Sequence, residues 1–134
     1  MMSLDFDQFQ AQSDAELLLE ELRSLTEDQI RSALQELGFL GTDKQVDLMK
    51  RFIANARVLD GDICAPLIDT YSANCYLYAD ERNAYQWFAC KRIKDFVKRG
   101  AFNIAQKVNP DTGRLRKYLC LTDTAIEVLT SPNF

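Results

Sequence analysis

The residues of this sequence best suited to a chemical task are the lysines and arginines of one segment. Residues 82–118 hold ten basic residues and only two acidic ones, whereas residues 1–81 hold sixteen acidic residues and six basic ones. The formal net charge of -4 therefore conceals a strongly positive segment. The local charge, rather than that of the whole chain, decides whether phosphate groups are attracted. The pattern indicates a nucleic-acid-binding surface, and charges that merely solvate a helix and a hairpin are the competing interpretation.

Other kinds of site have little support in the composition. The chain contains no histidine, which removes the commonest general base and every metal site that needs a histidine ligand. The four cysteines form no CxxC pair, and we expect them to be reduced, half-buried thiols. No glycine-rich loop of the kind that cradles nucleotide phosphates is present. We therefore expect no enzyme activity, no cofactor and no metal.

The periodicity predicts a basic helix over residues 83–99. With successive residues 100° apart, its apolar side chains share one face, and the other face carries the only tryptophan beside three lysines. Lysines bind phosphates, and an exposed aromatic ring packs on a sugar or a base. The alternative for the tryptophan is that it packs against the acidic N-terminal region. In a major groove the first residues of such a helix reach furthest. The candidate DNA contacts on this helix are Asn83, Trp87, Lys91, Lys94, Lys98 and Arg99.

A β-hairpin is expected directly after this helix. Apolar and polar residues alternate over 102–108 and again over 115–121, and Asn109-Pro110-Asp111-Thr112-Gly113 between them is a strong turn signal. Basic residues near the tip complete the candidate surface. We expect them to straddle the DNA backbone or to place an arginine in a minor groove. These residues are Lys107, Arg114 and Arg116.

Three capping boxes predict the helices of the N-terminal half. The first, at Ser13, predicts a helix over 14–24, and the second, at Thr26, predicts one that ends at Gly38. Almost nothing separates these two, so we expect an antiparallel helical hairpin. The third box, at Thr42, opens a longer helix through about residue 59.

The rest of the chain completes the expected fold. Pro66 suits the first turn of a short helix over 63–71, and Thr122 suits the N-cap of a last helix. The expected class is α+β, mainly α-helical with a small antiparallel β-hairpin. We divide it into an acidic helical hairpin over 1–40, for dimerisation or partner docking, and a second domain over 41–134.

Two passages carry a resemblance to a known family. One is Arg92-Ile93-Lys94-Asp95-Phe96-Val97-Lys98-Arg99-Gly100-Ala101-Phe102, and the other is Lys117-Tyr118-Leu119-Cys120-Leu121-Thr122, with the turn of 109–113 between them. Their order resembles the winged helix-turn-helix superfamily, in which a basic-and-glycine step leads from the recognition helix into the wing. In that family the second wing strand runs into a Leu-Thr helix cap, whereas residues 63–78 here depart from the usual second helix. The resemblance implies a winged helix-turn-helix protein that binds double-stranded DNA and regulates transcription, while the acidic start and the lack of a long apolar run predict a cytoplasmic location.

Other functions remain open at this point. The acidic residues 1–40 carry nine acidic and two basic residues, which suits a protein-interaction adaptor or a phage-type inhibitor that engages a basic partner. A plasmid or phage replication initiator is a narrower alternative. The acidic region either makes a homodimer or docks a protein partner, and no membrane association is expected because the chain has no long apolar run.

Overall fold

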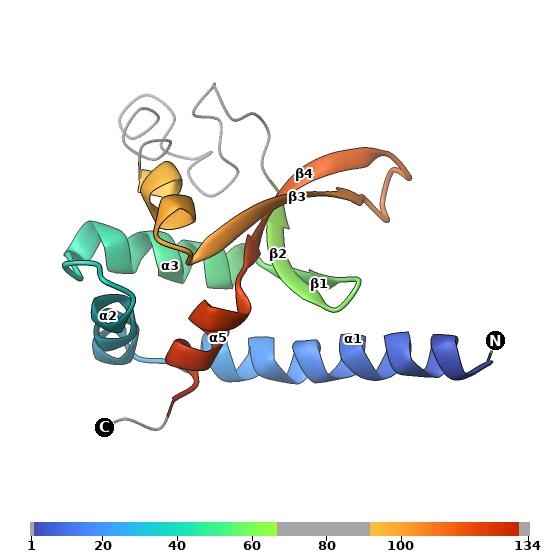
Figure 1. Cartoon of the computed structure of the whole chain (residues 1–134), viewed down its shortest axis with the longest axis horizontal. Coiled ribbons are helices and arrows are strands. Elements are labelled where there is room, and N and C mark those ends of the chain that lie inside the picture. Colours follow the sequence, from blue (N-terminus) through green and yellow to red (C-terminus); the bar gives the residue numbers. More distant parts are fainter. Residues whose placement is uncertain (1, 67–91, 132–134) are drawn as a thin grey trace.

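The computed structural model describes the backbone of residues 2–66 and 92–131, and the side chains of these ranges from Phe9 onward. The fold of the described residues is α+β (Figure 1). A helical segment over 92–98 also precedes β3. The elements are α1 (Met2–Arg23), α2 (Glu27–Glu36), α3 (Asp43–Asn55), β1 (Arg57–Leu59), β2 (Asp62–Pro66), β3 (Phe102–Val108), β4 (Leu115–Leu121) and α5 (Asp123–Leu129).

The four strands form one antiparallel sheet in the order β1-β2-β4-β3. The predicted hairpin over 102–108 and 115–121 is confirmed as β3 and β4, paired from Phe102 with Leu121 to Val108 with Leu115. Its turn closes when the amide of Gly113 donates to the carbonyl of Asn109 at 2.7 Å. The expectation of a single small hairpin was incomplete, because β4 also pairs with β2.

The strands β1 and β2 occupy residues for which helix was predicted. Helix α3 ends at Asn55 rather than near residue 59, and residues 62–66 are a strand rather than the start of a helix. The reason is the turn between the strands, in which Asp60 and Gly61 both have positive φ, at 55° and 81°. Two residues of positive φ make a type I′ turn, whose twist suits a tight hairpin and for which Asp-Gly is a preferred pair.

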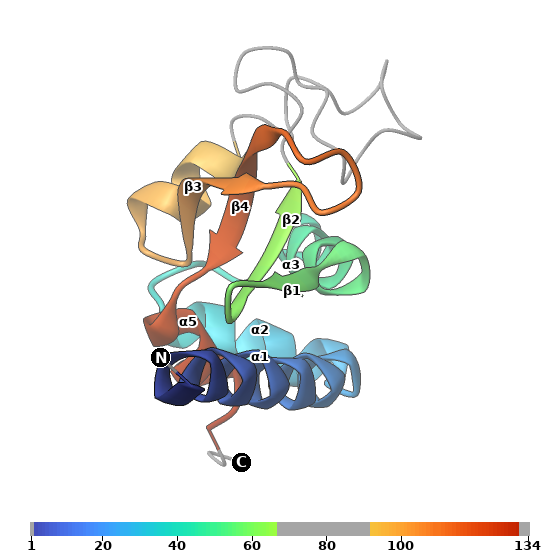
Figure 2. The ribbon, with the colours of Figure 1, turned by 90° about the vertical axis from the view of Figure 1, so that its right-hand side faces the viewer.

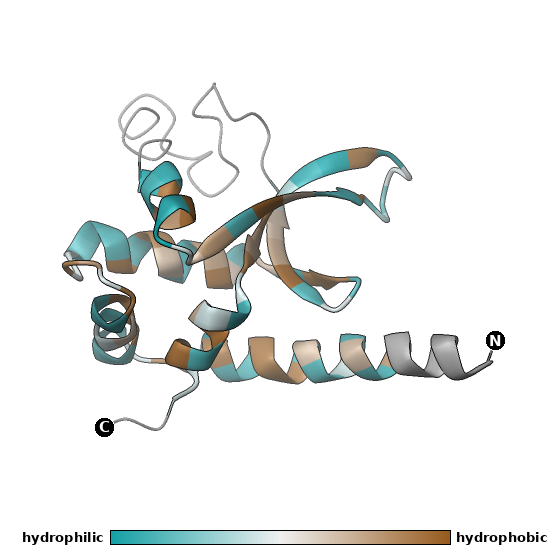
Figure 3. Ribbon diagram, in the orientation of Figure 1, coloured by the Kyte–Doolittle hydropathy of each residue, from teal (hydrophilic) through white to brown (hydrophobic). Residues whose placement is uncertain are grey.

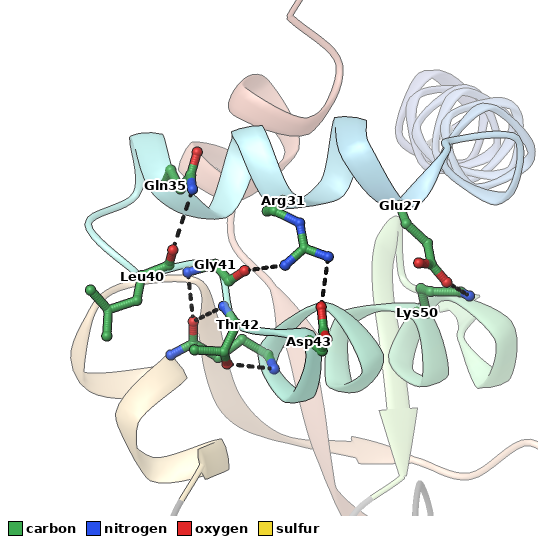
Figure 4. Close-up of polar contacts among 9 residues, drawn as sticks. Glu27, Arg31, Gln35, Leu40, Gly41, Thr42, Asp43 and Lys50 are labelled. Carbon is green, nitrogen blue, oxygen red and sulfur yellow. Dashed lines mark hydrogen bonds and ion pairs between the residues drawn. The ribbon is translucent and has the colours of Figure 1, made fainter.

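The helical hairpin expected at the N-terminus is wrong in two respects. Helix α1 begins near Met2 rather than at residue 14. It also lies crosswise to α2. In Figure 1, α1 lies in the plane of the picture and α2 is seen end-on, whereas in Figure 4 α2 lies in the plane and α1 is seen end-on. Instead of pairing with α2, α1 packs against the β1–β2 turn. The side-chain amide of Gln12 donates to the carbonyl of Val58 at 2.9 Å and accepts from the backbone amide of Gly61 at 3.1 Å.

Three predicted helix caps are confirmed. Thr26 and Thr42 each form a complete capping box with the glutamine three residues later, and the Thr122 hydroxyl accepts from the amide of Ala125. Each cap satisfies amides that the helix itself leaves without partners. These caps fix where α2, α3 and α5 begin.

One hydrophobic cluster unites helices and sheet. It contains Leu22 of α1, Leu34 of α2, Phe52 of α3, Leu119 of β4 and Leu129 of α5, all 3% exposed or less. The cluster therefore continues across residue 40, where we placed a domain boundary. In Figure 3 the strands are hydrophobic where they pass over the helices, and β4 is largely hydrophilic along the outer part of the hairpin. No helix in the described ranges has the length and apolar character that crossing a bilayer requires.

Candidate nucleic-acid interface

The candidate surface has two described parts, the helical segment 92–98 and the β3–β4 hairpin. Of the predicted contacts on the helix, Asn83, Trp87 and Lys91 lie outside the described residues. Lys94, Lys98 and Arg99 are described and exposed, as are Arg114 and Arg116 on the hairpin. Lys107 is described but differs from the others in its surroundings.

A buried aromatic side chain packs the helical segment against the rest of the described fold. Phe96 is fully buried between Phe39, which follows α2, and Phe102, the first residue of β3. The ring centroids lie 4.4 Å from Phe39 and 5.4 Å from Phe102. Offset contacts of this kind add to the free energy gained by burying the rings. Phe96 therefore fixes the segment that carries Lys94 and Lys98 relative to the hairpin.

Arg99 is engaged with the body at the end of this segment. Its guanidinium donates to the carbonyl of Gly38 at 3.0 Å, pairs with Asp95 at 3.3 Å and lies 5.5 Å from the centre of the Phe39 ring. The side chain remains about half exposed. Arg99 thus positions the helix end against the α2–α3 connection, and we do not count it among the available basic side chains.

The α2–α3 connection that receives Phe96 and Arg99 is itself tightly held (Figure 4). Arg31 of α2 donates to the carbonyl of Gly41 and pairs with Asp43 at 2.9 Å. Gln45 accepts hydrogen bonds from the amides of Gly41 and Thr42, at 2.8 and 3.1 Å. Gly41 has a φ of +79°, and a Cβ there would meet Arg31 at 3.0 Å, so any other residue would strain the connection.

The step from the helix into β3 also connects to the end of the hairpin. Gly100 has a φ of +82° and provides the left-handed turn that ends the helix. The hydroxyl of Thr122, directly after β4, donates to the carbonyl of Gly100 at 2.6 Å. The helix end, both strands of the hairpin and the start of α5 are thus joined at one point.

Lys107 is held inside the structure rather than offered to solvent. Its side chain is 10% exposed, and its ammonium lies 2.7 Å from the Asp62 carboxylate and 4.0 Å from that of Asp60. Burial alone would lower the pKa of Lys107, but the hydrogen bond to Asp62 and the nearby carboxylates hold the pKa above its ordinary value. Arg57 of β1 pairs in the same way with Asp111 in the β3–β4 turn, at 3.2 Å. Two ion pairs therefore connect the β1–β2 hairpin to the β3–β4 hairpin. Lys107 is not part of the exposed basic surface to which the sequence analysis assigned it.

We expect the Lys107–Asp62 pair to stabilise the fold by about 1 kcal/mol, more than an exposed pair does, because the ammonium is largely screened from solvent. A double-mutant cycle with Lys107→Ala and Asp62→Ala, followed by urea unfolding, measures this coupling. The Lys50–Glu27 pair, in which both side chains are about half exposed, is the matched control and should give a few tenths of a kcal/mol. Because the pKa of Lys107 is raised in the folded state, its contribution persists at neutral pH and is lost only as the pH rises through that value. Equal coupling energies for the Lys107–Asp62 and Lys50–Glu27 pairs would contradict the larger contribution expected of the Lys107–Asp62 pair.

The basic side chains differ sharply in whether they have protein partners. Every lysine and arginine from Arg23 to Arg57 makes an ion pair or another polar contact. From residue 92 onward most make neither an ion pair nor a side-chain hydrogen bond within the described ranges, and Arg99 and Lys107 are the exceptions. We call this set the unpaired bases: Arg92, Lys94, Lys98, Arg114, Arg116 and Lys117.

The unequal charge along the chain is also unequal in space. In Figures 1 and 2 the helical segment 92–98 and the β3–β4 hairpin lie on the side of the molecule opposite α1. Helix α1 has six acidic residues and one basic residue, whereas residues 92–117 have eight basic and two acidic residues. Phosphate would therefore be attracted to the hairpin side and repelled from α1.

Two features near the unpaired bases were not expected. Ile104, Val108 and Leu115 are 44%, 54% and 68% exposed, and their register places them on one face of the hairpin. Arg92 lines a cleft of about 420 Å³ between α2 and α3, whose rim also holds Arg31, Lys50 and the pairs they make. The alternation in β3 could have revealed the apolar trio, but nothing in the sequence places Arg92 beside α2.

Chemically the surface offers cations and apolar contact rather than reacting groups. No group of three or more metal-ligating side chains occurs in the described parts of the chain. The Glu27 carboxylate in the cleft accepts a hydrogen bond from Lys50, which lowers its pKa and keeps it ionised. Comparison with protein-family models, curated proteins and solved structures finds no match to this chain.

Proposed function

We propose that the protein binds double-stranded DNA through the helical segment 92–98, for which the sequence predicts a start at residue 83, and through the β3–β4 hairpin, as a regulator with a winged helix-turn-helix domain. The observation that carries the proposal is the distribution of the unpaired bases. A lysine or arginine that already has a carboxylate partner gives up that pair when it meets a phosphate, whereas an unpaired one does not. Within the described ranges, every base up to residue 57 has an ion pair or another polar contact, whereas six of the eight bases on the helical segment and the hairpin have none.

The fold supports the same proposal. The helical segment leads through Lys98, Arg99 and Gly100 into β3, and β4 runs through Leu121 into the Thr122 cap of α5. These are the two connections that the winged helix-turn-helix family uses around its wing. Within the proposal Lys94 and Lys98 contact phosphates beside the helix, and Arg114, Arg116 and Lys117 contact the backbone at the hairpin.

The proposal is tested by the anisotropy of a labelled mixed-sequence duplex titrated with the protein at several salt concentrations. Six phosphate contacts predict a slope of log K against log salt of about -5, so affinity should fall about a thousandfold between about 50 and 200 mM salt. A single-stranded oligonucleotide and heparin at equal charge are the controls. Absence of duplex binding at the lowest salt would contradict the proposal.

A second function is favoured by one specific observation on α1. Phe9 and Leu17 are 71% and 65% exposed on a helix whose other exposed residues include Asp14, Glu16 and Glu20. Large apolar side chains among carboxylates suit a protein partner with a basic rim and an apolar centre. This adaptor function predicts that the double variant Phe9→Ser with Leu17→Ser no longer binds the protein partner. The same variant should bind the labelled duplex as before in the anisotropy assay.

A further inference from the structure

Two cysteines face one another across the centre of the sheet. Cys64 of β2 and Cys120 of β4 are direct partners in the antiparallel register. Residues directly opposite in such a ladder have their Cα atoms roughly 4.5–5.5 Å apart, which falls within the span that a disulfide bridges. Both are free thiols, Cys64 fully buried and Cys120 6% exposed. Because they are opposite each other, both side chains lie on the same face of the sheet.

The surroundings of the pair distinguish the two sulfurs. Tyr118 is buried beside them, and the ammonium of Lys107 is close enough to act on both. A hydrogen bond from the Cys64 thiol lowers the pKa of Cys120, and Lys107 lowers it further. The same hydrogen bond, together with burial, raises the pKa of Cys64. Cys120 is therefore the thiol that ionises first, and it is also the more exposed of the two.

We propose that Cys64 and Cys120 form a reversible dithiol–disulfide site whose oxidant is a small-molecule disulfide of the glutathione disulfide class. The proposal stands on the facing geometry of the two residues and is independent of DNA binding. The two hairpins bound the site, with the Lys107–Asp62 pair beside it.

The reaction proceeds in two exchanges. The Cys120 thiol loses its proton, and the thiolate attacks one sulfur of the oxidant; the oxidant's S–S bond breaks, and its other half leaves and takes up a proton as a free thiol. Cys64 then loses its proton and attacks the Cys120 sulfur of the mixed disulfide, which releases the second half as a free thiol. The protein loses two protons and two electrons, and one oxidant molecule takes them up and becomes two thiols.

The bond would join β2 directly to β4 and close a long loop of the chain. A cross-link of this span restricts the unfolded state, so we expect the oxidised protein to melt about 10 °C above the reduced protein. The cross-link would also hold the β1–β2 hairpin to the β3–β4 hairpin without help from the ion pairs.

The test uses the full chain with Cys75→Ser and Cys90→Ser, so that Cys64 and Cys120 are the only thiols. The folded protein is incubated with oxidised glutathione and followed by intact mass. The proposal predicts loss of two hydrogens without a retained glutathione, reversal by dithiothreitol, and the higher melting temperature. Adding Cys64→Ala should arrest the reaction as a glutathione adduct on Cys120.

Two results would overturn the proposal. One is a stable glutathione adduct on Cys120 while Cys64 is present, which would show that Cys64 does not resolve it. The other is full retention of both thiols in the folded protein when urea-unfolded protein oxidises under the same conditions. Asp62→Asn removes a carboxylate beside the thiols and frees Lys107, so it should speed oxidation several-fold, whereas the distant Asp47→Asn should not. Equal rates for these two variants would contradict the role given to the ion pair.

Discussion

Replacing Lys94, Lys98, Arg114 and Lys117 with alanine is expected to weaken duplex binding about a thousandfold at about 0.1 M salt. Each base that contacts a phosphate releases about one counterion, so the slope of log K against log salt should shrink by about four units in the quadruple variant. Each half of the change, Lys94→Ala with Lys98→Ala or Arg114→Ala with Lys117→Ala, should remove about two units. Anisotropy titrations over a salt series measure both quantities.

The control for the two double variants removes the same amount of charge, two lysines, from another part of the surface. Lys44 and Lys50 are exposed lysines of α3 that line the cleft with α2, and both have partners in the protein. Lys44→Ala with Lys50→Ala should leave the slope nearly unchanged and reduce affinity slightly through the altered net charge. If the control variant bound the duplex as weakly as the double variants of the helical segment and the hairpin, net charge rather than the assigned surface would govern binding.

Phe96→Ala should lower the free energy of unfolding by about 3–5 kcal/mol, the largest stability effect we expect from any single substitution in the described residues. The ring is fully buried and contacts both Phe39 and Phe102, so its removal leaves a cavity at the junction of α2, the helical segment and β3. Urea unfolding followed by circular dichroism measures the change. Domains of this size are stable by about 5–15 kcal/mol, so the variant approaches the unfolding limit.

Two further variants keep this prediction testable if the alanine variant does not fold. Phe96→Leu retains most of the apolar volume and should cost about 1–2 kcal/mol. Phe9→Ala removes the same ring from a position that is 71% exposed and should change stability by less than about 0.5 kcal/mol. Similar costs for Phe96→Ala and Phe9→Ala would contradict the central position assigned to Phe96.

The elements with strong local signals were predictable from the sequence. Thr26, Thr42 and Thr122 begin helices because each places a hydroxyl where the first amides of the helix lack partners. The turn of residues 109–113 follows equally from Asn109, whose side chain accepts from the amide of Asp111, and from Gly113, which has a φ of +73°. These features depend on residues close in sequence.

The errors arose where a local signal was ambiguous. Asp60-Gly61-Asp62 suits both the end of one helix with the N-cap of the next and, because Asp-Gly lies between apolar residues, a tight hairpin turn; the pairing of β2 with β4 decides for the hairpin. Ser13 has the form of a helix cap, yet it lies within α1, because no glycine or proline among residues 2–12 interrupts a helix there. Tertiary contacts and the absence of a breaker outweighed the local patterns.

The candidate surface was predictable in its charge and not in its details. The excess of bases after residue 82 is visible in the sequence, but the Asp62 carboxylate that Lys107 contacts lies 45 residues away, and the Gly38 carbonyl that Arg99 contacts lies 61 residues away. Only the fold brings these groups together, so the sequence could not separate positioning bases from unpaired ones. The facing of Cys64 and Cys120 likewise follows from the strand register and from no spacing rule.

We propose that the unpaired bases of the helical segment and the hairpin form a DNA-binding surface. The most direct test is a map of backbone amide chemical shifts of the labelled protein, recorded by NMR with and without a short duplex. We expect changes at residues 92–98 and 113–117, and none along α1. Changes concentrated on α1, or none at a duplex concentration that saturates the anisotropy signal, would contradict it.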